Sequence, residues 1–182
     1  MRVISGEHRG IKLHSVPGKN TRPTSDKIKE SLFNIIGPYF SGGKVLDLFA
    51  GSGGLGIEAI SRGMDYGIFT EKSNAAIKTI NQNVQKIRAE DKIKVYRKDA
   101  FKALKRFADE KYVFKLILID PPYHFKDVHK YIDEIMEGNL IEEDGLIVYE
   151  HDSKVPAPIH NNLEKVREAM YGTTAITIYK KH

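Results

Sequence analysis

The chain of 182 residues contains no cysteine. This absence excludes disulfides, thiol nucleophiles, iron–sulfur clusters and cysteine-based zinc sites, and it suits a reducing cytoplasm. No apolar run approaches the ~20 residues of a transmembrane helix, and residues 1–7 lack the apolar stretch of a signal peptide. We therefore expect a cytoplasmic protein without a membrane partner. With 41% hydrophobic residues, a chain of this length needs no metal or disulfide to stabilise its core.

Metal ligation by histidine is not indicated either. The chain has seven histidines, but His124 and His129 are five residues apart, and no pair has the spacing of a ligand pair on a helix. We expect no metal site.

The excess of positive charge is small and lies near the N-terminus. The whole chain has a formal net charge of +5, and residues 1–30, with seven basic and three acidic side chains, carry +4. Lys and Arg supply the attraction to phosphates, so this segment is typical of an RNA-binding arm, although simple solubility is the alternative. Residues 121–150 are acidic, and we expect them to face solvent away from RNA. The candidate RNA-binding residues are Arg2, Arg9, Lys12 and Lys19.

The distribution of apolar residues divides the chain near residue 40. Before it, two short runs predict a hairpin, and a helix is expected to begin near Thr24–Asp26 and to end before Gly37-Pro38. After it, apolar runs alternate with amphipathic stretches, which is typical of βα units in a parallel sheet. We predict an α/β protein with a basic extension (1–40) and one domain (41–182). The expected strands are 44–49, 66–71, 92–97, 114–119 and 146–150, followed by an antiparallel pair at 163–168 and 173–179, and the clearest helix is 73–87.

The first predicted strand runs into a glycine-rich loop and a helix. The spacing Gly51-x-Gly53-x-x-Gly56 matches a dinucleotide-binding fingerprint, and Glu71 ends the second strand, where a carboxylate can hold ribose hydroxyls. Asp47, just before the loop, would repel a pyrophosphate but suits the sulfonium and amino groups of S-adenosylmethionine. The alternative is a helix-capping glycine turn with an incidental aspartate.

Two further carboxylates follow predicted strands. Asp99 comes after the third strand, where it can accept the adenine amino group of a cofactor or simply cap the next helix. Asp120-Pro121-Pro122-Tyr123 comes directly after the fourth strand and is the most specific motif in the chain. Prolines lack an N–H, so we expect both proline carbonyls of this loop to be free to accept hydrogen bonds from a ligand. The Asp120 carboxylate and the Pro121 carbonyl can then accept the two hydrogens of an exocyclic amine, while Tyr123 stacks on the base.

The chain resembles the RsmD family of class I S-adenosylmethionine-dependent methyltransferases over nearly its whole length. The resemblance rests on these motifs, on residues 2–13 and 21–34, and on the terminal Tyr171-Gly172-Thr173-Thr174. The departures are small: Lys29 stands where the family more often has Arg, and Tyr123 where Phe is also used. The resemblance implies a Rossmann-like, seven-stranded, mostly parallel sheet with an antiparallel last strand. It also implies transfer of a methyl group to the N2 amine of guanine in 16S ribosomal RNA, at position 966, within an assembling small ribosomal subunit.

The candidate residues follow from the motifs and the resemblance together. The candidate catalytic residues are Asp120, Pro121, Pro122 and Tyr123. The candidate cofactor-binding residues are Asp47, Phe49, Gly51, Ser52, Gly53, Glu71, Lys72, Asp99 and Ala100, to which the resemblance adds Arg22 and Thr24 near the methionine end.

Three alternatives remain at this point. An adenine-N6 methyltransferase acting on DNA or RNA can use the same Asp-Pro-Pro-Tyr loop. A nicotinamide-dependent oxidoreductase accounts for the glycines but leaves Asp47 and the two prolines unexplained. An RNA-binding assembly factor that retains the cofactor fold needs no chemistry, but the intact Asp120 and Tyr123 argue against it.

Overall fold

The computed structural model describes residues 1–18, 24–122 and 125–182. Its helices are α1 (Asp26–Ile36), α2 (Gly54–Ser61), α3 (Asn74–Lys86), α4 (Ala100–Asp109) and α5 (Val128–Glu137). Its strands are β1 (Lys44–Asp47), β2 (Tyr66–Glu71), β3 (Ile93–Arg97), β4 (Phe114–Ile119), β5 (Ile141–Asp152), β6 (Leu163–Tyr171) and β7 (Thr174–Lys181). None of the helices in these ranges is long and apolar enough to cross a membrane.

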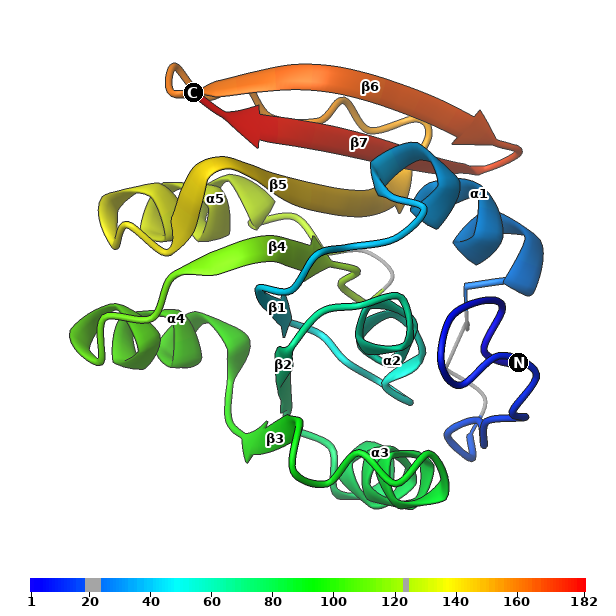
Figure 1. Ribbon diagram of the computed structural model, residues 1–182. Helices are drawn as coiled ribbons and strands as arrows, with labels where there is room; N and C mark the ends of the chain where they lie inside the picture. Colours follow the sequence, from blue (N-terminus) through cyan, green and yellow to red (C-terminus); the bar gives the residue numbers. More distant parts are fainter. Residues whose placement is uncertain (19–23, 123–124) are drawn as a thin grey trace.

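The strands form one sheet in the order β3-β2-β1-β4-β5-β7-β6 (Figure 1). Strands β1 to β5 pair in parallel, whereas β7 runs antiparallel to both β5 and β6. The strand order reverses between β1 and β4, and open α/β sheets bind ligands outside the carboxyl ends of strands at such a switch point. The predicted α/β fold with an antiparallel last strand is confirmed.

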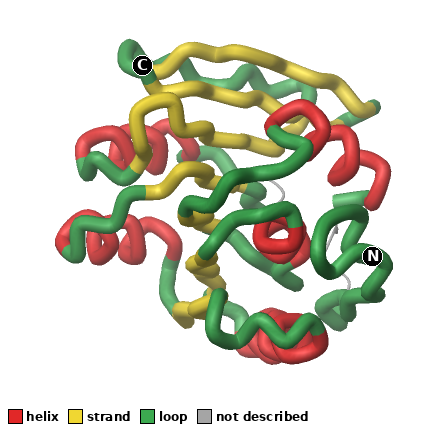
Figure 2. Tube along the Cα trace, in the orientation of Figure 1, coloured by secondary structure: helices red, strands yellow, loops and turns green. Residues whose placement is uncertain are grey.

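Helices cover both faces of this sheet, with α1, α2 and α3 on one side and α4 and α5 on the other (Figures 1 and 2). The first layer buries Leu32, Ile57 and Ile80 in one apolar core, and the second buries Leu104 and Ile132 in another. Helices α1, α3, α4 and α5 each place one apolar stripe against the sheet, which is the arrangement that their 3.6-residue periodicity predicts, whereas α2 is buried on all sides.

Most predicted elements lie where the sequence places them. Ser25 caps α1 by accepting a hydrogen bond from the Ile28 N–H, and Ser73 caps α3 in the same way. Strand β1 is shorter than expected, because the chain turns into the glycine loop directly after Asp47. Strand β5 is longer than predicted, because its acidic first half, residues 141–145, lies beyond a register shift against β4 and lacks the apolar run used to find it.

The predicted N-terminal hairpin forms only one antiparallel bridge, between Arg2 and Lys12. The reason is that its backbone bonds partly to α2 instead of to itself: the Ile4 and Ser5 N–H groups donate to the Glu58 carboxylate. Residues 1–18, hereafter the arm, nevertheless pack on the body, since Val3 is fully buried in the core of the first helical layer. The boundary near residue 40 stays a prediction.

Candidate active site

The glycine loop between β1 and α2 takes its shape from two glycines with positive φ. Gly51 has φ 57° and Gly53 has φ 85°, a region that other residues rarely adopt. A Cβ placed on Gly51 would meet no atom within 4 Å, so the backbone there lies open to an approaching ligand. Gly53 is the N-cap of α2, and Ser52 stands between the two glycines. The loop thus offers an exposed backbone at a helix N-terminus.

Asp47 is buried at the end of β1, directly beneath this loop. Its Oδ2 accepts a hydrogen bond of 3.0 Å from the Gly56 N–H. Burial raises the pKa of the Asp47 carboxyl to about 7, although the bond from Gly56 acts in the opposite direction. Asp47 therefore fastens the first turn of α2, and a cation placed beside it would stabilise its ionised form.

Glu71 ends β2 next to the same loop. One carboxylate oxygen accepts a 3.0 Å bond from the Gly51 N–H, and the other accepts 3.1 Å bonds from the N–H groups of Lys72 and Ser73. Three backbone donors thus orient a partly exposed carboxylate toward the glycine loop. This is the position in which a carboxylate can take the hydroxyls of a ribose.

Asp99 and Ala100 lie at the start of α4. Asp99 is its N-cap, and its Oδ2 accepts a 3.2 Å bond from the Lys102 N–H, while Ala100 is buried. The capping role weighed for Asp99 is therefore present. The role of Asp99 toward a cofactor remains a prediction, as does that of the exposed Lys72.

The Asp120 carboxyl lies at the end of β4, beside Glu150 of β5. The Thr24 hydroxyl joins the two, at 2.7 Å from Glu150 Oε2 and 3.2 Å from Asp120 Oδ2. Burial raises the pKa of Asp120 well above its ordinary value, and the negative charge of Glu150 raises it further. Ionisation of Asp120 is therefore less favourable than that of an ordinary aspartate, because it is buried and would place a second negative charge beside Glu150.

The proline turn beyond Asp120 is only partly available to a ligand. The Pro122 carbonyl accepts a 3.2 Å bond from the Phe125 N–H, so the expectation that both proline carbonyls are free is wrong for Pro122. Pro121 is half-buried, and Phe49, which follows β1, makes an edge-to-face contact with Phe125 near this loop. Tyr123, Arg22 and Lys19 lie outside the described residues.

Family comparison agrees with this arrangement of motifs. A family model described as "Conserved hypothetical protein 95", which corresponds to the RsmD family, matches residues 1–180. The chain belongs to the RsmD family.

Relatives of this RsmD-family chain align along its whole length. It is 48% identical over 182 residues to the Bacillus subtilis protein named "Putative rRNA methyltransferase YlbH", covering 100% of this chain and 99% of that protein. It is 30% identical to "Ribosomal RNA small subunit methyltransferase D" of Haemophilus influenzae, covering 99% and 93%.

Solved structures show the same fold. A structure titled "Putative methyltransferase yhhF from Escherichia coli" has a TM-score of 0.86 at 30% identity, covering 100% of this chain and 98% of that one. An RNA methyltransferase from Salinibacter ruber in complex with S-adenosyl-L-homocysteine has a TM-score of 0.66 at 15% identity, covering 88% and 94%. The RsmD-family chain therefore has a class I methyltransferase fold.

Two buried polar residues that sequence reasoning missed, Glu58 and Asn83, hold the arm against helices α2 and α3. Glu58 of α2 is fully buried and accepts bonds from Arg62 Nε and from two arm N–H groups, with Lys29 Nζ at 3.4 Å. Burial lowers the pKa of Lys29. Asn83 of α3 bonds to both the N–H and the carbonyl of His14 in the arm, and also to the Ser52 carbonyl in the glycine loop.

The role of the candidate RNA-binding residues of the arm stays a prediction. Arg2, Arg9 and Lys12 are all exposed. No group of three or more His, Asp or Glu side chains within the described ranges is arranged to hold a metal ion.

Proposed function

We propose that this RsmD-family chain transfers the methyl group of S-adenosylmethionine to the N2 amine of a guanine in 16S ribosomal RNA, in the cytoplasm and within an assembling small subunit. The observation that carries the proposal is the Asp120 carboxyl, held beside Glu150 at the switch point of the sheet and next to a glycine loop open to a ligand. The relatives are named as ribosomal RNA methyltransferases, and these names support ribosomal RNA as the substrate class.

The residues beneath the glycine loop fit the proposed cofactor. The open backbone at Gly51 admits its ribose, Glu71 offers a carboxylate for the ribose hydroxyls, and Asp47 supplies a negative charge near the loop. Asp99, Ala100, Phe49 and Lys72 would surround the adenosine, and Thr24 and Arg22 the methionine end. The bound cofactor supplies an electrophilic methyl group on a positively charged sulfur.

The chain's own contribution to methyl transfer is to orient the amine. The N2 lone pair of guanine is delocalised into the ring, so the amine is a poor nucleophile. If Asp120 and the Pro121 carbonyl each accept one amine hydrogen, the nitrogen becomes more tetrahedral and its lone pair points at the methyl group. The N2–C bond would then form as the S–C bond breaks, S-adenosylhomocysteine would leave, and the acidic methylated amine would give its proton to the Asp120 carboxylate or to water. Such positioning supplies roughly 7–11 kcal/mol in well-ordered reactions. Tyr123 would stack on the base once it leaves its own stack.

The neighbouring carboxyl of Glu150 bears on which base is chosen. Guanine presents two adjacent donors, N1–H and the N2 amine, and two ionised carboxylates can accept both. Adenine presents an amine beside the acceptor N1, which suits a carboxylate beside a protonated carboxyl. The ionised form of Asp120 is the form that suits guanine, and a sulfonium cation bound nearby would favour that form by lowering the pKa of Asp120.

Nucleoside analysis separates these functions. The purified protein is incubated with methyl-labelled S-adenosylmethionine and small-subunit RNA or particles from cells lacking the gene, and the RNA is digested. We expect labelled N2-methylguanosine. Labelled N6-methyladenosine would support the adenine alternative, and binding of RNA and cofactor without any methylation would support an assembly factor.

A further inference from the structure

The basic charge of the chain has a second centre that the N-terminal arm does not explain. Residues 72–98, which span α3 and β3, carry eight basic and two acidic side chains, a net charge of +6, compared with +4 for residues 1–30. The remainder of the chain, 31–71 and 99–182, has fourteen basic and nineteen acidic side chains and is therefore negative, at −5. All of the positive excess thus lies in the first 30 residues and the α3–β3 unit.

These two basic segments are neighbours in space. The arm lies beside α3 (Figure 1), where the Lys86 side chain donates to the Lys12 carbonyl and Asn83 holds both backbone groups of His14. Lys78 and Arg97 are exposed, as are Arg9 and Lys12 of the arm. The arm and the α3–β3 unit are therefore in contact, and both present exposed cations.

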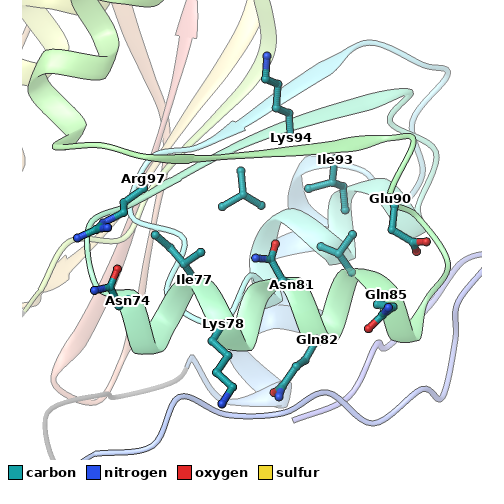
Figure 3. Close-up of a pocket in the computed structure, with 12 residues that line it drawn as sticks. Asn74, Ile77, Lys78, Asn81, Gln82, Gln85, Glu90, Ile93, Lys94 and Arg97 are labelled. Carbon is teal, nitrogen blue, oxygen red and sulfur yellow. The ribbon is translucent and has the colours of Figure 1, made fainter.

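A groove of about 840 Å³ lies within the α3–β3 unit, between α3 and the sheet-edge strand β3 (Figure 3). Ile77 and Ile93 contribute apolar surface to it, and Asn81 of α3 extends toward the strand. Asn74 and Arg97 lie together at one end of the groove, and Gln85 and Glu90 lie at the other. The groove therefore combines amide donors and acceptors with an apolar wall along a positively charged edge.

One end of the groove lies at the carboxyl ends of the strands, where the candidate active site also lies. Arg97 is the register partner of Glu71, so the Arg97 end lies at the carboxyl ends of the strands. Three strand spacings separate β3 from β4, which ends just before Asp120, a distance of about 14 Å. An RNA strand whose target base reaches Asp120 is thus within a few nucleotides of this groove.

We infer that the α3–β3 groove, together with the adjoining face of the arm, binds the RNA backbone that flanks the target nucleotide. Charge complementarity selects this occupant, because the net charge of +6 attracts a polyanion and an exposed amide such as Asn81 can bond to bases or ribose hydroxyls. The inference rests on the proposed function only in taking ribosomal RNA as the substrate.

The test compares three variants, two double and one single, with the unmodified full-length protein. Lys78→Ala/Arg97→Ala removes two exposed charges from the proposed surface, and Asn81→Ala removes a groove amide. Lys102→Ala/Lys105→Ala removes two exposed charges from α4, on the opposite face of the sheet, and is the matched control. Binding of a fluorescent single-stranded RNA from the small-subunit sequence is measured over a range of salt concentrations, separately from methylation.

We expect Lys78→Ala/Arg97→Ala to bind this RNA about tenfold more weakly at 0.1 M salt. The slope of log affinity against log salt should become shallower by about 1.4, which corresponds to two phosphate contacts on a single strand. In methylation assays the KM for RNA should rise while kcat at saturating RNA stays unchanged. Asn81→Ala should weaken binding without changing the salt slope, and the α4 variant should match the wild type.

Unchanged RNA affinity and salt slope in Lys78→Ala/Arg97→Ala would overturn the inference. If, in addition, poly-glutamate protected the β3 amides from hydrogen exchange, the groove would belong to an acidic protein partner instead. A wild-type protein that binds no RNA would refute both this inference and the proposed function. A wild-type protein that binds RNA at this surface but methylates no ribosomal RNA would refute the proposed function alone.

Discussion

The Thr24 hydroxyl donates a hydrogen bond of 2.7 Å to Glu150 Oε2, across 126 residues of sequence. The same hydroxyl lies 3.2 Å from Asp120 Oδ2, so a residue just before α1 bridges the two carboxyl groups at the ends of β4 and β5. This bridge connects the start of the first helix to the proposed catalytic carboxylate. It also makes the ionisation of Asp120 depend on two neighbours that act in opposite directions.

Substituting these two neighbours should therefore shift the pH dependence of methylation in opposite directions. The charge of Glu150 raises the pKa of Asp120, so Glu150→Gln should move the acidic limb of the pH–rate profile to lower pH. The Thr24 hydrogen bond lowers that pKa, so Thr24→Val should move the limb to higher pH, and Thr24→Ser should restore it. Single-turnover rates at saturating RNA and cofactor measure these shifts. Identical profiles for all four proteins would show that Asp120 does not need to be ionised.

The buried carboxyl of Asp47 should leave a signature in the stability of the ligand-free protein. Its pKa is raised to about 7 in the folded state, compared with 3.8 for an ordinary aspartate, so the folded state holds a proton that the unfolded state releases. Stability from this group is present below pH 4 and is lost as the pH rises to 7, by a few kcal/mol. Asp47→Asn removes the titration and can still accept the Gly56 N–H. Urea unfolding between pH 4 and pH 8 should show the variant gaining stability relative to wild type as pH rises. A constant difference would contradict the assignment.

Glu71 should control cofactor affinity without controlling RNA affinity. If its carboxylate holds ribose hydroxyls, Glu71→Ala should weaken binding of S-adenosylmethionine by about 1–3 kcal/mol in calorimetry. Asn74→Ala, at the exposed first residue of α3, serves as the control for cofactor binding. Tight binding of NAD, with no binding of S-adenosylmethionine or its demethylated product, would contradict the cofactor assignment.

The exposed cations of the arm should contribute to RNA affinity but not to cofactor affinity or to the unfolding free energy. Deleting residues 1–18 would also remove Val3 and Leu13 from the core, so side-chain truncation is the cleaner test. Arg9→Ala/Lys12→Ala should weaken RNA binding and make its salt dependence shallower, while cofactor affinity and the unfolding free energy stay near wild type. Unchanged RNA affinity in this variant would remove the arm from the binding surface.

The fold and the carboxylates after the strands were predictable because their signals are local. The Gly51–Gly56 spacing, the apolar run before Asp120 and the capping serine of α3 are each contained within a few residues. The bridging role of Thr24 and the positions of Glu58, Asn83 and Glu150 were not predictable in this way, because their partners lie 53 to 126 residues away. Glu150 had one local signal, a carboxylate at the end of a predicted apolar strand beside the switch point.

The central claim is that Asp120 orients the N2 amine of guanine for methylation, and one measurement tests it most directly. Wild type, Asp120→Ala and the control Asp127→Ala, an exposed carboxylate at the start of α5, are each given unmethylated small-subunit RNA in a single turnover. Nucleoside analysis should find N2-methylguanosine with wild type and Asp127→Ala, and none with Asp120→Ala, although this variant still binds RNA and cofactor. A near-wild-type yield of N2-methylguanosine from Asp120→Ala would contradict the account.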